Sequence, residues 1–291
     1  MTTPAGPTTP AAPAAPPDTP APPDPTPPPA PHRLAAQLRL LGVRPGQRLL
    51  VHAALGGTGL CAEALRDALL AALGPRGTLL VPAFTAENSL TSTAHLARIA
   101  GLDEAEVAAF RARMPPFDPE LTPSQSVGAF AEVVRTTPGA ARSGHPQTSF
   151  AALGADAHRL CAGHRTESHL GEESPLGKLC REGGRVLMIN VGFSACTAFH
   201  LAEYRIPKPP LRMYDCVVKV NHPEGRRGLP RGGEWTTYED VALDDGDFEE
   251  IGRAFPDSLV RRGRVGGTSA VSFSIPHAVD HAQAWMTGNR R

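Results

Sequence analysis

A histidine and a glutamate stand three residues apart in the stretch that runs from Met188 to Glu203. Residues three apart in a helix share one face, so the side chains of His200 and Glu203 are expected to be neighbours. A histidine ring oriented by a carboxylate is the usual arrangement of a general base. The same spacing also occurs in structural or solvated pairs, so the rest of the chain has to decide between these interpretations.

The residues before this pair indicate where it lies in the fold. Arg185 to Ile189 is an apolar run that predicts a buried strand, and a loop of small residues follows it. A helix is predicted to begin near Thr197, whose hydroxyl can cap it by accepting from a backbone N–H two or three residues on. The pair would then lie just beyond the carboxyl end of a strand, where open α/β sheets usually bind their ligands.

The first part of the chain differs in composition from the rest. Of the 291 residues, 1–31 are nearly all Pro, Ala, Thr and Asp. Such a segment cannot bury enough apolar surface to offset its ordering entropy, so it is predicted to be a disordered tail with polyproline II character. It lacks the apolar and basic regions of a secretory signal. Residues 32–291 are long enough for one large α/β domain.

Charge and cysteine content exclude several classes of protein. The formal net charge is zero, which gives no sign of a nucleic-acid-binding surface. No apolar run is long enough for a transmembrane helix, so no membrane partner is expected. The five cysteines are scattered and none forms a C-x-x-C pair, so neither a zinc knuckle nor a disulfide scaffold is expected. A reducing cytoplasm is the predicted location.

The order of predicted elements is that of an α/β protein. Strands at 47–52 and 78–81 flank a helix at 62–73, which makes a βαβ unit. The segment 84–114, with a helix at 102–113, is an insertion after a strand end and a candidate lid over a site. Further helices are predicted at 34–41, 128–135, 156–162, 175–180, 247–255 and 276–286, and further strands at 148–153, 216–221, 234–241 and 263–274. The expected fold is a three-layer α/β/α structure with a mixed, largely parallel central sheet.

Six groups of residues, in register over nearly everything after the tail, carry a family resemblance. They are Leu41-Gly-Val with Leu50-Val-His-Ala-Ala-Leu55, Gly74 to Thr85, Met114 to Pro123, Arg142 to Gly154, Ser174 to Leu179 and Thr197 to Glu203. In this order they resemble the aminoglycoside 3-N-acetyltransferases, a family of antibiotic-resistance enzymes. Any one of these motifs alone is weak evidence, whereas all six in register are specific.

The resemblance implies a reaction and roles for the histidine–glutamate pair. It implies direct transfer of an acetyl group from acetyl-coenzyme A (acetyl-CoA), the co-substrate, to the 3-amino group of a 2-deoxystreptamine aminoglycoside. Amines of this kind are largely protonated near neutral pH, so a base must accept a proton. The resemblance and the spacing together assign that role to His200, with Glu203 orienting or charging its ring.

The residues expected to hold acetyl-CoA include one departure from the family. The family usually has serines after the histidine of the first strand, where this chain has Ala53 and Ala54. The turn at Gly56, Gly57 and Thr58 can still offer backbone N–H groups to an anion. Thr197 is a second candidate, as a donor to the thioester oxygen rather than a simple cap.

Two residues are candidates for binding the aminoglycoside. His145, in the motif Arg142-Ser-Gly-His-Pro, is either a pocket residue or a hydrogen-bonded structural histidine. Asp118 either faces a cationic substrate or is a turn residue that bonds its own backbone. Among charged residues, Lys178 is either a phosphate partner or a surface lysine, and the acidic run at 239–250 is either an anionic wall or a solvated helix start.

Two other functions remain open from the sequence. One is a related acyltransferase that acts on another amine in secondary metabolism. The other is a metal-dependent amide hydrolase built on His145, His164, His169 and His200, but these four lack metal-ligand spacing, so no metal is expected. The pair His277 and His281 has the H-x-x-x-H spacing and is interpreted as a surface pair. The oligomeric state is left open.

Overall fold

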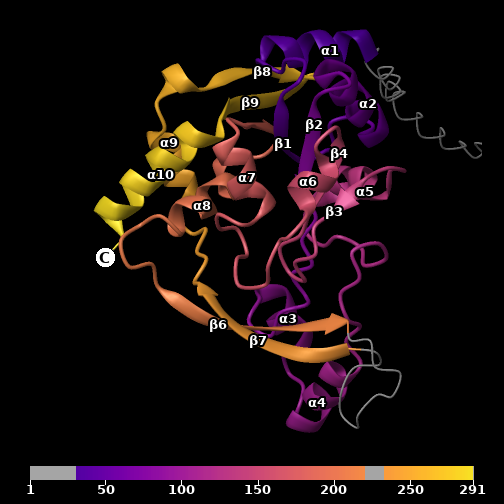
Figure 1. Ribbon diagram of the computed structural model, residues 1–291, viewed down its shortest axis with the longest axis vertical. Helices are drawn as coiled ribbons and strands as arrows, with labels where there is room; N and C mark the ends of the chain where they lie inside the picture. Colours follow the sequence, from indigo (N-terminus) through magenta and orange to yellow (C-terminus); the bar gives the residue numbers. More distant parts are fainter. Residues whose placement is uncertain (1–30, 220–232, 291) are drawn as a thin grey trace, which may run out of the picture.

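The computed structural model of the protein describes residues 31–219 and 233–290. Seven strands of this part form a central sheet in the order β3-β4-β2-β1-β5-β9-β8 (Figure 1). Its strands are β1 (Arg48–Ala53), β2 (Thr78–Pro82), β3 (Ala141–Arg142), β4 (Phe150–Gly154), β5 (Arg185–Ile189), β8 (Arg261–Val265) and β9 (Thr268–Ser274). The tail predicted at 1–31 lies almost wholly outside the described residues, as do residues 220 and 221 of a predicted strand.

Parallel pairing is confined to the centre of the sheet. The neighbours β2 and β5 both run parallel to β1, with Leu50 opposite Leu80 and Val186. The next strands outward, β4 and β9, run antiparallel to their neighbours, and the edge strands β3 and β8 are antiparallel to these in turn. The sheet is mixed, as predicted. Most of its strands point in the direction of β1, because the edge strands β3 and β8 do so as well, but neighbouring strands are parallel only at the centre. The hairpin between β8 and β9 is too short for a parallel crossover.

Alternate residues of the central strands face two separate cores. Leu49 and Val51 pack on one face of the sheet and Leu50 on the other, which is the two-residue period of a strand buried on both sides. One face is covered by α1 (Pro31–Leu40), α2 (Ala62–Leu73) and α5 (Gly128–Thr136). The other is covered by α6 (Ala157–Cys161), α7 (Pro175–Arg181), α8 (His200–Glu203), α9 (Phe248–Ala254) and α10 (Ile275–Asn289). The three-layer α/β/α arrangement is therefore confirmed.

A second, two-stranded sheet lies apart from the central one (Figure 1). It consists of β6 (Leu211–Lys219) and β7 (Gly233–Val241), and the insertion after β2, with α3 (Thr93–Ile99) and α4 (Glu104–Ala112), lies beside it. Asn88 of the insertion is bonded to the backbone of Val217, with its Oδ1 accepting at 2.8 Å and its Nδ2 donating at 3.0 Å. The insertion is thus anchored on β6.

Two findings bear on the predicted class of protein. All five cysteines lie in the described part of the chain, and each has a free thiol. No helix within residues 31–219 and 233–290 combines the length and the apolar character needed to cross a membrane.

Candidate active site

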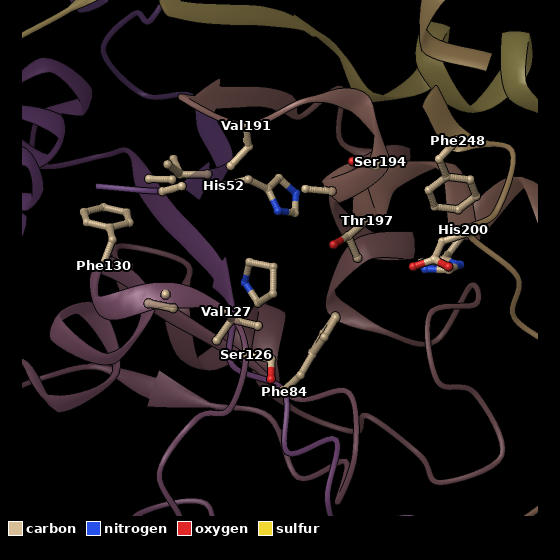
Figure 2. A pocket seen from close by; sticks show the side chains of 18 residues that line it. His52, Phe84, Ser126, Val127, Phe130, Val191, Ser194, Thr197, His200 and Phe248 are labelled. Atoms are coloured by element: carbon tan, nitrogen blue, oxygen red, sulfur yellow. The ribbon is translucent and has the colours of Figure 1, made fainter. Parts of the chain in front are cut away.

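A cavity of about 350 Å³ lies at the carboxyl ends of the three parallel strands (Figure 2). The segments that follow β1, β2 and β5 form most of its wall, and the beginnings of α5 and α9 complete it. Its lining residues are Val51, His52, Ala53, Ala54, Pro82, Phe84, Ser126, Val127, Gly128, Phe130, Ala131, Val191, Ser194, Ala195, Thr197, His200, Asp245 and Phe248. The candidate lid contributes only its first residue, Phe84, so α3 and α4 do not cover the cavity.

His200 and Glu203 meet at the edge of this cavity, as their spacing predicts. The His200 Nδ1 and Glu203 Oε2 atoms are 2.7 Å apart, and the two side chains are 15% and 1% exposed. An ionised carboxylate only accepts hydrogen bonds, so Nδ1 carries the proton and donates. In the neutral ring the lone pair then lies on Nε2, the nitrogen that a general base would use.

The second oxygen of Glu203 is held by groups from distant parts of the chain. Glu203 Oε1 accepts from the backbone N–H of Asp244 at 2.9 Å and from Arg290 Nη1 at 2.6 Å. Arg290 also forms two bonds with Asp247, at 2.7 and 2.6 Å. Burial lowers the pKa of Arg290, but its bonds to Asp247 and Glu203 outweigh this and raise the pKa. No local pattern in the sequence links Arg290 to the pair.

Thr197 lies in the cavity wall, but the prediction that it caps a helix is wrong. Two short 3₁₀ turns, Phe193–Ala195 and Thr197–Phe199, precede α8, which begins only at His200. Cys196 is the N-cap of the second turn and Phe199 that of α8, so Thr197 lies inside a 3₁₀ turn and is the N-cap of neither element. Figure 2 shows its hydroxyl turned towards the interior of the cavity.

His52 is a cavity residue that the sequence reasoning did not single out. It is the next-to-last residue of β1, only 8% exposed, and its Nε2 has no hydrogen-bond partner. Burial lowers its pKa to about 4, so its ring is neutral. The available signal was a polar residue near the end of an otherwise apolar strand.

The amino end of α5 forms the wall opposite the pair. Ser126, with a φ of 58°, and Gly128, with a φ of 83°, both adopt left-handed backbone conformations there. A Cβ atom at Gly128 would lie 3.1 Å from the carbonyl oxygen of Ala53, so the approach of α5 to β1 favours glycine at this position.

The predicted phosphate-binding turn lies next to the cavity but not in its wall. Gly56, Gly57 and Thr58 follow Ala54 in an exposed or half-exposed turn. The Thr58 hydroxyl donates to the carbonyl of Leu55 at 2.7 Å, which stabilises the turn. Helix α2 begins at Ala62, a few residues later, and a role for this turn in binding acetyl-CoA stays a prediction.

His145 is not brought into the cavity. Its side chain is fully buried, its Nδ1 accepts from the backbone N–H groups of Gln147 and Thr148 at 3.1 Å, and its Nε2 lies 3.1 Å from the carbonyl of Thr166. Burial, followed by the charges of His169 and His164, holds its pKa well below the ordinary value. This geometry matches the structural interpretation of His145.

Asp118 also matches its structural interpretation. Its Oδ1 accepts from the backbone N–H groups of Glu120 and Leu121, and its Oδ2 accepts from Lys219 Nζ at 3.0 Å. The bond to Lys219 is the main reason why its pKa is lowered. Lys178 likewise donates to carbonyls at the end of α6, those of Leu160 and Ala162, instead of projecting freely.

The acidic run at 239–250 is divided between structural roles and the cavity. Asp240 is buried and accepts from the backbone N–H of His169 and from the Tyr204 hydroxyl, both at 2.7 Å. Asp247 binds Arg290, as described above. Of the acidic residues in this run, Asp245 alone lines the cavity, and its side chain is exposed.

Three of the four histidines of the metal-hydrolase alternative, His145, His164 and His169, are close together, and their ring nitrogens are already bonded. The ring of His145 lies 4.8 Å from that of His164 and 4.4 Å from that of His169. Within residues 31–219 and 233–290, no group of three or more His, Cys, Asp or Glu side chains is placed to hold a metal ion. His277 is exposed, whereas His281 is half-buried with its Nε2 3.1 Å from the Ile251 carbonyl.

The comparison with protein families identifies the family of the chain. A family model described as aminoglycoside 3-N-acetyltransferase matches residues 50–287. The chain therefore belongs to the aminoglycoside 3-N-acetyltransferase family, in which acetyl-CoA is the acetyl donor. The resemblance seen in the sequence is confirmed.

Individual relatives cover most of the chain. The YokD protein of Bacillus subtilis (strain 168), an SPbeta prophage-derived aminoglycoside N(3')-acetyltransferase-like protein, is 31% identical over an alignment of 264 residues that covers 88% of this chain and 92% of YokD. Aminoglycoside N(3)-acetyltransferase VII of Streptomyces paromomycinus is 32% identical over 272 residues, 87% of this chain and 90% of its own.

Solved structures resemble the whole fold. The crystal structure of YokD superposes with a TM-score of 0.79 at 30% identity and covers 89% of this chain and 99% of YokD. A structure described as AAC-IIIb binary with CoASH has a TM-score of 0.74 at 29% identity, with 89% and 96% of the two chains covered.

Proposed function

We propose that the protein acetylates the 3-amino group of a 2-deoxystreptamine aminoglycoside with acetyl-CoA, by direct transfer, and thereby inactivates the antibiotic. The observation that carries this proposal is the bond of 2.7 Å between His200 Nδ1 and Glu203 Oε2 at the edge of the cavity. In the neutral ring this bond leaves the lone pair on Nε2 and orients it, which is what an amine acceptor requires of its base. The names of the relatives support the choice of acceptor.

Direct transfer needs no nucleophile from the protein. His200 Nε2 takes the proton that the acceptor nitrogen loses, the nitrogen attacks the thioester carbonyl carbon, the C–N bond forms, and the C–S bond breaks. The proton on His200 then passes to the released coenzyme thiolate, which leaves as the thiol and restores the base. Cys196, the cysteine nearest to His200 in sequence, is fully buried, and burial raises the pKa of its thiol to about 12. A thiol of this kind is a poor nucleophile, which supports a single-step transfer.

Charge develops on the thioester oxygen as the amine attacks. A hydrogen-bond donor aimed at this oxygen stabilises the transition state in a partly dry site. We assign this role to the Thr197 hydroxyl, which faces the interior of the cavity. A Thr197→Val variant is then expected to lower kcat more than it changes either KM, because the bond strengthens only in the transition state.

The cavity lining combines small apolar residues with a charged one, which supports binding of both donor and acceptor. Ala53, Ala54 and Ala131 are small apolar residues of the lining, which suit a narrow pantetheine arm. Asp245 adds a negative charge to the lining, which suits a polycationic acceptor. The backbone N–H groups of the turn at residues 56–58 are our candidates for the phosphates, since Ala53 and Ala54 have no hydroxyl groups.

The test is release of coenzyme thiol from acetyl-CoA with a panel of aminoglycosides that contain or lack 2-deoxystreptamine. We expect turnover with the first group only, and NMR of the product should show acetylation at N3. A His200→Ala variant should bind both substrates and lose about 10²- to 10⁴-fold in kcat. His277→Ala, an exposed histidine on α10, is the matched control and should keep the wild-type rate.

Two results would contradict the proposal. Wild-type kcat in His200→Ala would remove the histidine from the reaction. Turnover with other amines, and none with any aminoglycoside, would instead identify an acyltransferase of secondary metabolism.

A further inference from the structure

We propose that Arg290, at the end of α10, is a positioning residue that holds the Glu203 carboxylate and thereby sets the orientation of the His200 ring. This inference rests on the proposed role of His200. It adds a residue that lies outside the cavity wall and acts only through Glu203.

The contacts of Arg290 show that its guanidinium is clamped on both sides. Nη1 donates to Glu203 Oε1 at 2.6 Å, while Nε and Nη2 donate to the two carboxylate oxygens of Asp247 at 2.7 and 2.6 Å. Nη2 also donates to the carbonyl oxygen of Asp244 at 2.6 Å. The planar fork of an arginine is needed for this set of bonds, because a lysine cannot bind Asp247 in a bidentate manner.

The two oxygens of Glu203 have separate partners. Oε2 accepts from His200 Nδ1, whereas Oε1 accepts from Arg290 and from the Asp244 N–H. Fixed partners on both oxygens set the plane of the carboxylate, and that plane sets the direction of the bond to the imidazole. Without Arg290, a single backbone N–H would hold Oε1. The Glu203 carboxylate, which is 1% exposed, would also lose a cationic partner, and within the described residues only His200 would remain to pair with it.

The short length of α8 explains why an external anchor is needed. The helix spans only His200–Glu203, a single turn, and a single turn has little stability of its own. Helix α10 packs against α8, and its last turn brings Arg290 to Glu203. The same guanidinium ties Asp247, next to α9, into the arrangement. Three segments that are far apart in sequence therefore converge on one carboxylate.

The kinetic test is a double-mutant cycle. Arg290→Gln should lower kcat by about tenfold to a hundredfold, with smaller changes in the KM of either substrate. Arg290→Lys should recover only part of the loss. In a Glu203→Gln background, Arg290→Gln should cause little further loss, because the residue acts through Glu203. Equal loss in both backgrounds would overturn the proposal.

The matched control is Arg48→Gln. Arg48 also binds two carboxylates, those of Asp156 and Glu182, both at 2.7 Å, but it lies at the opposite end of β1. This variant should keep the wild-type kcat even if it lowers stability to a similar extent. Equal kcat losses in Arg48→Gln and Arg290→Gln would reduce Arg290 to a general stabiliser and contradict its positioning role.

A readout without substrates separates this proposal from the proposed function. In ¹⁵N-NMR of the imidazole rings, wild-type His200 should show one tautomer, protonated at Nδ1, whereas Arg290→Gln should show a mixture. This result is expected even if no aminoglycoside is acetylated. An unchanged single tautomer in the folded variant would overturn the proposal. If Arg290→Gln does not fold, Asp247→Asn, which keeps Arg290 but loosens its clamp, should show a smaller shift in the same direction, and no shift there would also overturn it.

Discussion

His200 and the cluster of His145, His164 and His169 place the same residue type in opposite situations. The His200 ring has one nitrogen bound to Glu203 and the other available at a cavity. In the cluster, the nitrogens of His164 are 2.9 Å from the Ser143 hydroxyl and from the His169 carbonyl, and those of His169 face the hydroxyls of Tyr238 and Thr148. A histidine can take part in proton transfer only if one nitrogen is left for the substrate, so proximity of histidines alone does not define a site.

The carboxylates near the two groups differ in the same way. Glu203 binds the ring of His200 directly and has a cationic partner in Arg290. Asp240 instead binds the backbone N–H of His169 and the Tyr204 hydroxyl, and burial raises its pKa. A carboxylate on the ring prepares a base, whereas a carboxylate on the backbone connects β7 to the core. We therefore interpret the cluster as a structural unit and the pair as the proposed general base.

Lowering the pH is the test with the largest expected effect, because the neutral histidines of the buried cluster should make the free energy of unfolding depend on pH. Burial lowers the pKa of His164 to about 4 and that of His169 to about 3, below the ordinary value of 6.5. The unfolded chain thus binds more protons than the native protein below about pH 6.5, so stability is complete above that value and falls as the pH decreases towards 4. His164 alone should lower the free energy of unfolding by roughly 3 kcal/mol over this range. The raised pKa of Asp240 opposes this trend only near its own titration range.

Denaturant unfolding followed by circular dichroism at a series of pH values measures this loss. Replacement of the exposed His158 by Gln should leave the slope unchanged. A free energy of unfolding that stays constant between about pH 6.5 and about pH 4.5 would show that the cluster is not held neutral.

His164→Ala should affect stability instead of catalysis. The variant would remove an acceptor from the Ser143 hydroxyl and a donor from the carbonyls of Ser168 and His169, and would leave a hole next to Phe150. We expect the free energy of unfolding to decrease by about 2 to 4 kcal/mol, with kcat per folded molecule close to wild type. Thermal unfolding together with active-site titration checks both parts. A kcat loss as large as that of His200→Ala would place the cluster in the reaction.

Neutralising the two carboxylates one at a time sharpens the contrast further. Glu203→Gln should lower kcat by about a hundredfold, because an amide does not specify which nitrogen of His200 carries the proton. Asp240→Asn should lower the free energy of unfolding by about 1 kcal/mol and change kcat by less than a few-fold, since Asp240 does not contact an imidazole. Steady-state kinetics with both substrates measures the first effect, and denaturant unfolding the second. The reverse assignment of effects would refute the distinction between pair and cluster.

The parts of the fold that follow from local pattern were predictable from the sequence. Helix α2 spans the predicted residues 62–73 and β5 the predicted 185–189, because apolar periodicity and flanking glycines define both. Helix α3 had no such signal, since His95 is its only buried residue. The antiparallel direction of β4 and β9 depends on the path by which the chain returns to the sheet, and local sequence patterns do not predict that path.

The same division applies to the candidate site. His200 and Glu203 are three residues apart, so helical geometry alone predicts their contact. Arg290 reaches Glu203 across 87 residues of sequence, and His52 and Asp245 come from other strands and loops, so only the tertiary structure brings them together. The prediction of a cap at Thr197 was wrong because the chain forms 3₁₀ turns before α8. The small residues of this segment are compatible with either conformation, so the sequence does not distinguish them.

Asp245→Asn should have the smallest effect. Its exposed carboxylate lines the cavity that also contains His200, and we expect it to attract an acceptor ammonium through a charge that water and salt screen. An exposed ion pair is worth about 0.2 to 1 kcal/mol, so the KM for the aminoglycoside should rise by about two- to fivefold at low salt, with kcat unchanged and the difference smaller at high salt. Asp257→Asn, which replaces an exposed carboxylate paired with Arg262, should leave both constants unchanged. A fall in kcat at constant KM would mean that Asp245 acts on the His200–Glu203 pair and not on the binding of the aminoglycoside. The proposed base would then depend on a second carboxylate besides Glu203.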